Sequence, residues 1–326
     1  MGVFSERPDM PLKNGIDDID LKILNQLEAD ARTDLKDIAE KCSLTSSAVL
    51  RRVEKLKAGK VIVGTWVELK RGIFGYSLEA TVAITAENSK VDQVAQKVRV
   101  IPNVMVCAKS IGRYNVFSHV FAKSLADMDN VTHKIKDIAG VRAVSTNIYI
   151  DDFSDTKEIY SSQNPFNLDE IDLRLIDELL KDAQAPFVRI AKALAICPET
   201  VRQRFEKLRK NGIIIKCSIT VDRSKIGYQG ACFILISCSK NQSVQSIINT
   251  LKELQIFKLI GRTIGSAFDI SAMTFIKDIK DLAAIIAELE KIPEIENIEV
   301  AISTFTYYSY IPKPLAPYKC DYTELS

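Results

Sequence analysis

The sequence has few of the residues on which most enzymes depend, with two histidines, one tryptophan and seven cysteines that form no CxxC pair. His119 and His133 do not suffice for a Ser-His-Asp triad or a metal site, so we expect no catalytic residue, metal or cofactor. The cysteine spacing fits reduced thiols. No window holds the roughly 18 uncharged apolar residues of a membrane span, and residues 1–15 lack the pattern of a signal peptide. We therefore expect a cytoplasmic protein with no membrane partner.

One pattern occurs twice in the chain. A shift of about 152 positions places residues 19–24 over residues 171–176, and about 18 of roughly 61 residues then agree without a gap. Arg52 falls on Arg204, and Gly75 falls on Gly227. The sequence therefore predicts a tandem duplication with two equal halves.

Each half opens with a pattern typical of three short helices. Apolar residues recur at helical spacing from Ile19 to Leu27, and a second short helix is expected around Ile38. Thr45 is a good N-cap for a third helix, which ends near Gly59. The order predicts a helix-turn-helix, and the β-rich run 61–69 is expected to form a wing or a strand leading away from it.

Basic residues gather at the third helix of both halves, although the formal net charge is only +2. Residues near the N-terminal end of such a helix meet base edges, and arginine there reaches guanine or phosphate. The candidate contacts to double-stranded DNA are Thr45, Ser46, Ser47, Leu50, Arg51, Arg52 and Lys55 in the first half, and Glu199, Thr200, Arg202, Gln203, Arg204 and Lys207 in the second. Because the two sets differ, we expect the halves to read different half-sites of an asymmetric operator.

The rest of each half changes to strand and helix patterns in the order βαββαβ, which predicts a ferredoxin-like module. In the strand 114–122, Val116 and Val120 lie on one face, whereas Phe117 and Phe121 lie on the other with His119 between them. This alternation predicts a core or interface position for His119. It also means that the helix-free face needs a cover, which a second module would supply.

The predicted fold class is α+β, with two winged helix-turn-helix domains alternating with two ferredoxin-like modules. The predicted boundaries are 1–15 for a polar tail, 16–76 for the first winged helix-turn-helix, 77–150 for the first module, 151–167 for a linker, 168–228 for the second winged helix-turn-helix, 229–311 for the second module and 312–326 for a tail.

Several of these motifs resemble the leucine-responsive regulator family, Lrp/AsnC. They are Asp17-Asp18-Ile19-Asp20-Leu21-Lys22-Ile23-Leu24, Asp30-Ala31-Arg32, Ile38-Ala39 and Val49-Leu50-Arg51-Arg52-Val53-Glu54-Lys55-Leu56. The resemblance implies a module that dimerises and, in many members, binds an amino acid between subunits. Since the usual member carries one copy, this chain resembles a covalently fused dimer, and assembly into homo-oligomers is expected.

The resemblance also implies an effector contact at a Gly-x-x-Asp turn. The matching residues are Gly112, Arg113, Tyr114 and Asn115 in the first half, and Gly265, Ser266 and Asp269 in the second, where the turn is one residue longer. Asn115 lacks the charge with which an aspartate pairs with an ammonium group, so the first turn fits an amino acid less well.

The function predicted from these patterns is sequence-specific, DNA-binding transcription regulation with small-molecule sensing and no enzyme activity. Two alternatives stay open. A sequence-tolerant architectural protein would carry the same basic helices. Siroheme decarboxylases resemble this family in fold, and the segment 114–117 with His119 faintly resembles their pocket strand, although no Arg-x-His run precedes Tyr114.

Overall fold

The computed structural model describes residues 15–150, 168–239, 243–304 and 309–310, and these fall into two compact units. The helix-turn-helix unit takes its described residues from 15–75 and 168–226, and the sheet unit takes them from 76–150 and from 227 onward. Each unit therefore combines a piece of both halves. The predicted linker, the C-terminal tail and all of the N-terminal tail except Gly15 lie outside the described residues.

The helix-turn-helix unit contains two groups of three helices, as the repeat predicts. They are α1 (Asp18–Ala29), α2 (Leu35–Cys42) and α3 (Ser46–Ala58), then α6 (Glu170–Lys181), α7 (Phe187–Leu194) and α8 (Pro198–Lys210). Asp17 and Asp169 each begin the first helix of a group with a capping box. The Thr45 hydroxyl accepts a hydrogen bond from Ala48 N at 3.3 Å, which confirms the predicted N-cap of α3.

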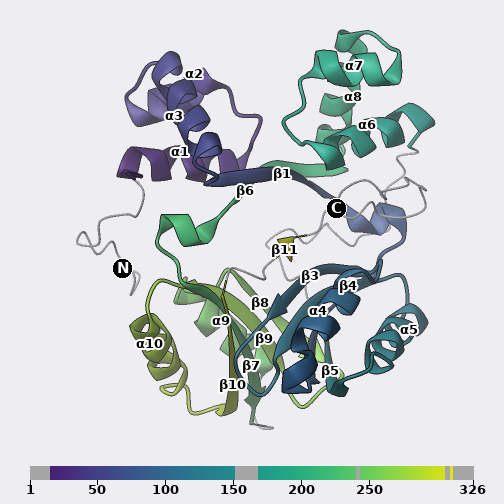
Figure 1. Ribbon diagram of the computed structural model, residues 1–326, viewed down its shortest axis with the longest axis vertical. Helices are drawn as coiled ribbons and strands as arrows, with labels where there is room; N and C mark the ends of the chain where they lie inside the picture. The colour runs from purple at the N-terminus through teal and green to yellow at the C-terminus, as the bar shows by residue number, and fades with distance from the viewer. Residues whose placement is uncertain (1–14, 151–167, 240–242, 305–308, 311–326) are drawn as a thin grey trace. The chain divides into compact units, whose positions relative to one another are not determined.

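A two-stranded antiparallel ribbon joins the two groups. β1 (Ile62–Leu69) pairs with β6 (Ile214–Val221), from Ile62 opposite Val221 to Leu69 opposite Ile214. In Figure 1, β1 leaves the first group and ends beneath the second, and β6 runs the opposite way. Of the two predicted alternatives, the β-rich run is therefore the strand leading away, and its pairing partner comes from the other half. The short helices η1 (Arg71–Phe74) and η3 (Arg223–Ile226) follow these strands.

The sheet unit contains the βαββαβ order twice. The elements are β2 (Leu78–Ala86), η2 (Asn88–Lys90), α4 (Val91–Arg99), β3 (Val104–Lys109), β4 (Val116–Ala122), α5 (Leu125–Lys136) and β5 (Val141–Tyr149), then β7 (Gly230–Cys238), α9 (Val244–Glu253), β8 (Leu259–Ile264), β9 (Ile270–Ile276), α10 (Ile279–Leu289) and β10 (Ile295–Thr304). The strand orders β5-β2-β4-β3 and β10-β7-β9-β8 confirm two ferredoxin-like modules.

The two modules are joined along their edges. β5 pairs with β8 at Ile148 opposite Ile264, and Ile111 forms a bridge with Ile302 of β10. A two-residue strand, β11 (Ser309–Tyr310), extends the β3 edge, which makes a sheet of nine described strands. Because the modules meet at both edges, their helix-free faces lie against each other.

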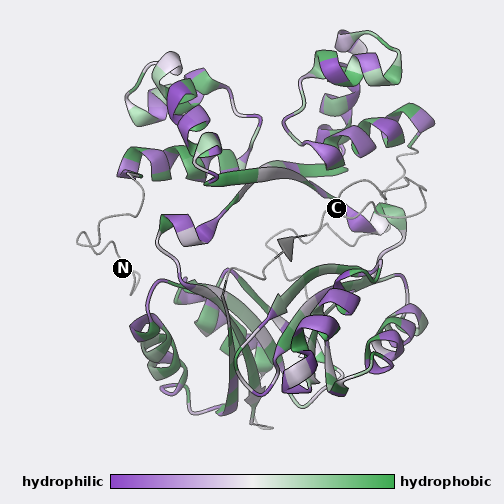
Figure 2. Cartoon of the chain, viewed as in Figure 1, coloured by the Kyte–Doolittle hydropathy of each residue, from purple (hydrophilic) through white to green (hydrophobic). Residues whose placement is uncertain are grey.

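The helix-free faces share a core of their own. Phe117 of β4 stacks on Phe233 of β7 with ring centroids 4.7 Å apart, and Leu235, Phe268 and Ala301 are buried around them. Val116 and Val120 face the helices of their own module. Figure 2 shows strands that are mostly hydrophobic and helices that carry both kinds of residue. The predicted cover of the first sheet by the second is confirmed. Within the described ranges, no helix combines the length and apolarity that a membrane crossing requires.

We expect the substitution Phe117→Ala to lower the free energy of unfolding by about 3–5 kcal/mol, because it leaves a cavity in a core that both modules line. Urea unfolding followed by circular dichroism measures the loss. The control Ile279→Ala removes a side chain that is 65% exposed and should cost under about 0.5 kcal/mol. Equal, small losses in both variants would contradict a shared core.

Candidate nucleic-acid interface

The N-terminal part of α3 presents an exposed face beside its buried stripe. Val49, Val53 and Leu56 are buried, and the stripe leaves a face on which Leu50 is 44% exposed and Arg51 is exposed beside it. The predicted contacts Thr45, Ser46, Ser47 and Lys55 are exposed as well. In the described part of the chain, Arg51 has no ion pair. Its guanidinium is therefore available to a base or a phosphate.

Arg52 and Arg204 differ from the other predicted contacts, because intramolecular ion pairs hold both. Arg52 Nη1 lies 2.8 Å from Asp17 Oδ2 and 2.7 Å from Asp20 Oδ1, and the Asp20 side chain is only 1% exposed. Arg204 binds Asp169 and Asp172 in the same way, at 2.7 Å each. We call each set the arginine clamp. It fixes the third helix of a group to the start of the first, and it engages Nη1 of each arginine within the protein.

In α8, the exposed face carries a closed network of charges. Arg202 donates to Glu199 through Nε at 3.0 Å and through Nη2 at 2.6 Å, and its Nη1 donates to Glu206 at 2.7 Å. Gln203 Nε2 also donates to Glu199, at 3.0 Å. The hydrogen bonds with Glu199 raise the pKa of Arg202. The Thr200 hydroxyl bonds to the Cys197 thiol at 3.0 Å, and Lys207 is exposed on the same helix.

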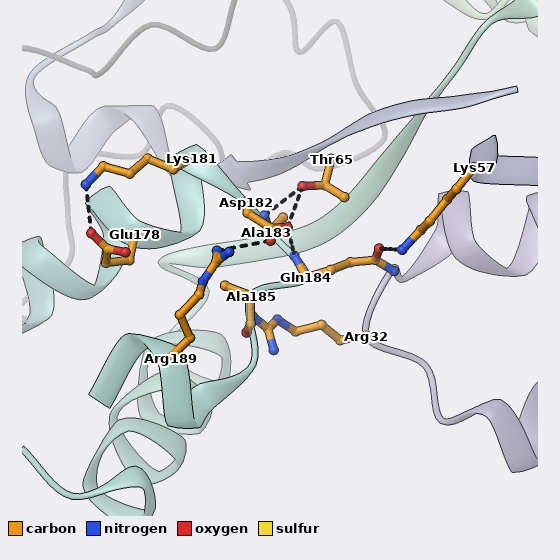
Figure 3. Close-up of polar contacts among 10 residues, drawn as sticks. All are labelled: Arg32, Lys57, Thr65, Glu178, Lys181, Asp182, Ala183, Gln184, Ala185 and Arg189. Carbon is orange, nitrogen blue, oxygen red and sulfur yellow. Dashed lines mark hydrogen bonds and ion pairs between the residues drawn. The ribbon is translucent and has the colours of Figure 1, made fainter. Parts of the chain in front are cut away.

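Polar contacts join the two helix-turn-helix groups (Figure 3). The Thr65 hydroxyl of β1 accepts from Ala183 N at 2.8 Å and donates to Asp182 at 3.1 Å. Gln184 Nε2 donates to the Ala31 carbonyl at 2.8 Å, and Lys57 donates to Gln184 Oε1 at 3.2 Å. The α6–α7 connection is thereby held to the first half.

Arg32 makes several contacts with the second group. Its Nη2 donates to the Ala185 carbonyl at 2.8 Å, and its guanidinium lies 4.7 Å from the Phe187 ring centroid and 4.9 Å from that of Phe205. Asp30 beside it pairs with Arg209 at 2.8 Å. This contact could not be predicted from the sequence, since nothing in a linear pattern indicates which side chains meet across the two halves.

The two predicted effector turns lie against the opposite module. Gly112 has φ +146°, and a Cβ there would lie 2.8 Å from the Val300 carbonyl oxygen of β10. Gly265 has φ +95°, and a Cβ there would lie 3.0 Å from the Thr146 carbonyl oxygen of β5. Both positions therefore require glycine. Each turn lies where one module approaches the last strand of the other.

Within these turns, several predicted effector contacts have structural roles. Asn115 exchanges two hydrogen bonds of 2.8 Å with the backbone of Ala86, and Asp269 accepts one of 2.8 Å from Cys238 N. These bonds tie the start of the third strand of each module to the end of its first. Tyr114 is buried, and the Ser266 hydroxyl donates to Asn147 at 2.5 Å. Arg113 is exposed.

His119 is half-buried on β4, beside Phe121 on the helix-free face of its module. Its Nε2 bonds to the buried Glu79 carboxylate, and its ring packs on Phe121 at 5.0 Å. Nearby, the Tyr149 hydroxyl donates to Ser271 of the other module at 2.9 Å, and burial raises the pKa of this tyrosine. His133 is exposed on α5, with Nδ1 2.9 Å from the Asp129 carbonyl oxygen.

Comparison with known proteins gives matches to both helix-turn-helix groups and to the first of the two sheet modules. The AsnC-type helix-turn-helix domain matches residues 16–57 and again 168–209, and the Lrp/AsnC ligand binding domain matches residues 79–159. Regulatory protein AsnC of Haemophilus influenzae is 30% identical over 138 residues, which are 42% of this chain and 91% of that protein. HTH-type transcriptional regulator FL11 of Pyrococcus abyssi is 28% identical over 149 residues, which are 46% of this chain and 97% of that protein.

Among solved structures, the siroheme decarboxylase NirDL is similar over 88% of this chain and 91% of its own, with a TM-score of 0.59 and 15% sequence identity. At 15% identity, this similarity shows that the two proteins share a fold and shows nothing more. It extends over both halves of the chain, whereas each curated relative above matches somewhat less than half of it.

We expect the substitution Arg52→Ala to destabilise the helix-turn-helix unit by about 2–3 kcal/mol, because it leaves the buried Asp20 carboxylate without its cation. Unfolding followed by fluorescence of Trp66, the single tryptophan, measures the change. The neighbouring control Arg51→Ala should change stability by less than about 0.5 kcal/mol. Equal effects of the two substitutions would contradict the distinct role of the arginine clamp.

The clamp also gives the unit an acid sensitivity. Hydrogen bonds from Arg204 hold the pKa of Asp169 below its ordinary value of 3.8. A lowered folded-state pKa adds stability above pH 3.8, and this stability is lost as the pH falls through the folded-state value. We expect Asp169→Asn to lower the melting temperature at neutral pH. The melting temperature of this variant should also fall less than that of the wild type as the pH is lowered. The control Glu170→Gln, in the same turn, should show the same dependence of melting temperature on pH as the wild type.

Proposed function

This chain belongs to the Lrp/AsnC family, and on that premise we propose that it is a transcription regulator whose helices α3 and α8 bind double-stranded DNA sequence-specifically. The observation that carries the proposal is the exposed N-terminal face of α3, with Arg51 unpaired in the described part of the chain. In a helix-turn-helix, this part of the third helix enters the major groove and meets base edges. The arginine clamp supports such a role, because it fixes the angle of the helix that would enter the groove.

The covalent link between the halves would raise the affinity for a paired operator. Once one helix-turn-helix is bound, the ribbon β1–β6 and the Arg32 contact hold the second one at a high effective concentration. Because the exposed residues of α3 and α8 differ, we propose an operator with two different half-sites. A cytoplasmic location beside the chromosome follows from this role.

We further propose that a small molecule, such as an amino acid, binds at the effector turns and alters the assembly of chains into homo-oligomers. The match to the Lrp/AsnC ligand binding domain supports sensing, and the position of each turn against the opposite module supports a site that responds to module packing. Since Asn115 and Asp269 bond to the backbone, the exposed Arg113 is the best placed group for an effector carboxylate.

Titration calorimetry with the amino acids, combined with light scattering, tests the effector proposal. Heat of binding that disappears in the substitution Arg113→Ala, together with a change in oligomer size, is the expected result. Absence of heat and of any size change with every amino acid would refute it.

The likeness to NirDL gives the proposal an enzymatic rival, which we set aside because that likeness is one of fold alone. An absorbance titration with siroheme separates the two. A chromophore that binds and then loses the mass of CO2, measured by mass spectrometry, would establish the enzyme. An unchanged spectrum in protein that binds DNA would leave the regulator.

We expect a footprint on DNA upstream of the protein's own gene to show two protected half-sites separated by one or more helical turns. The double substitution Arg51→Ala and Arg202→Ala should abolish the footprint, while melting of the protein stays unchanged, because both side chains are exposed. Competition with random DNA across a salt series distinguishes the architectural alternative. Such a protein would bind all sequences equally with a steep salt dependence.

A further inference from the structure

The most informative difference between the two halves lies at the same three positions of α3 and α8. With the shift between the halves, Ser47 matches Glu199, Leu50 matches Arg202 and Arg51 matches Gln203. The first set offers a hydroxyl, an exposed apolar side chain and an arginine without a partner in the described ranges. The second set offers the Glu199 carboxylate, which accepts two hydrogen bonds from Arg202. One helix therefore presents separate groups, and the other presents a single preformed unit.

Glu199 and Arg202 together carry the acceptor and the donors that a C·G base pair requires in the major groove. Residues 199 and 202 are three positions apart, which places them on the same face of the helix. A carboxylate accepts a hydrogen bond from the amino group of cytosine, and a guanidinium donates two to guanine. Because Glu199 accepts from two donors on one edge of the Arg202 guanidinium, Nε and Nη2, the arginine loses little rotamer freedom when it reaches a base.

The same network weakens non-specific attraction to DNA. Glu199 and Glu206 both pair with Arg202, so two negative charges accompany one positive charge on this exposed face. A phosphate backbone is attracted to net positive charge and is repelled by unneutralised carboxylates. On α3, the corresponding acid is Glu54 alone, since Ser47 replaces the other.

Resting on the proposed function, we infer that Glu199 and Arg202 together read a C·G base pair in the second half-site, and that this half supplies sequence discrimination while the first supplies more of the affinity. The two halves of the chain thus have different roles at one operator.

A binding-site selection with the full-length chain tests this inference, because the duplication and the network provide matched variants. Glu199→Ser installs the residue of the first half, and Glu206→Ser removes the same charge about two turns further from the N-terminal end of α8. The two carboxylates are similarly exposed, with side chains at 54% and 58%, so neither substitution is expected to affect folding. A melting curve of each variant checks this.

We expect both substitutions to tighten binding to random DNA. Only Glu199→Ser should lower discrimination at a single C·G position of the second half-site, by about tenfold, with the first half-site unchanged. The reciprocal change, Ser47→Glu with Leu50→Arg, should create a C·G preference in the first half-site. If Glu199→Ser and Glu206→Ser alter random-DNA binding equally and neither shifts a base preference, the inference is overturned. If the wild-type chain selects no sequence, the proposed function itself fails.

Discussion

The burial of the helix-free sheet faces is the constraint on which the sheet unit depends. A ferredoxin-like module covers one face of its sheet with helices and leaves the other apolar, and burial of apolar surface contributes about 25 cal/mol per Å². Here Phe117 of the first module stacks on Phe233 of the second, with Leu235 and Phe268 buried beside them. Since both modules belong to one chain, this core does not depend on protein concentration, as it would in a dimer of separate subunits.

Joining the halves also removes the constraint of symmetry. In a dimer of identical subunits, a substitution in the third helix changes both DNA contacts at once. In this chain the two helices can differ. Leu50 of the first half corresponds to Arg202 of the second, and Ser47 corresponds to Glu199. The ribbon β1–β6 keeps the two helix-turn-helix groups in one unit while their exposed faces diverge.

Most of the fold could be predicted from the sequence, because its signals are local. Apolar periodicity and caps such as Thr45 locate the helices, and the two apolar faces around Phe117 indicate a covered sheet. The pairing of β1 with β6 could not be predicted, since both a wing and a leading strand fit the pattern. The contact of Arg32 with the Phe187 ring joins residues far apart in sequence, and no local pattern encodes such a pair.

The exposed face of the third helix could be predicted from the sequence, but the contacts of each residue on it could not. An exposed arginine and a clamped arginine look alike in a basic run, and Arg51 and Arg52 are adjacent. The signal that separates them is the repeat, because Asp17, Asp20 and Arg52 all recur in the second half, whereas Arg51 becomes Gln203. These three positions, which keep the same residue in both copies, hold the third helix of each group in place. Since the clamp is the same in both groups, a difference in base preference between them would come from the exposed side chains and not from the way each helix is held.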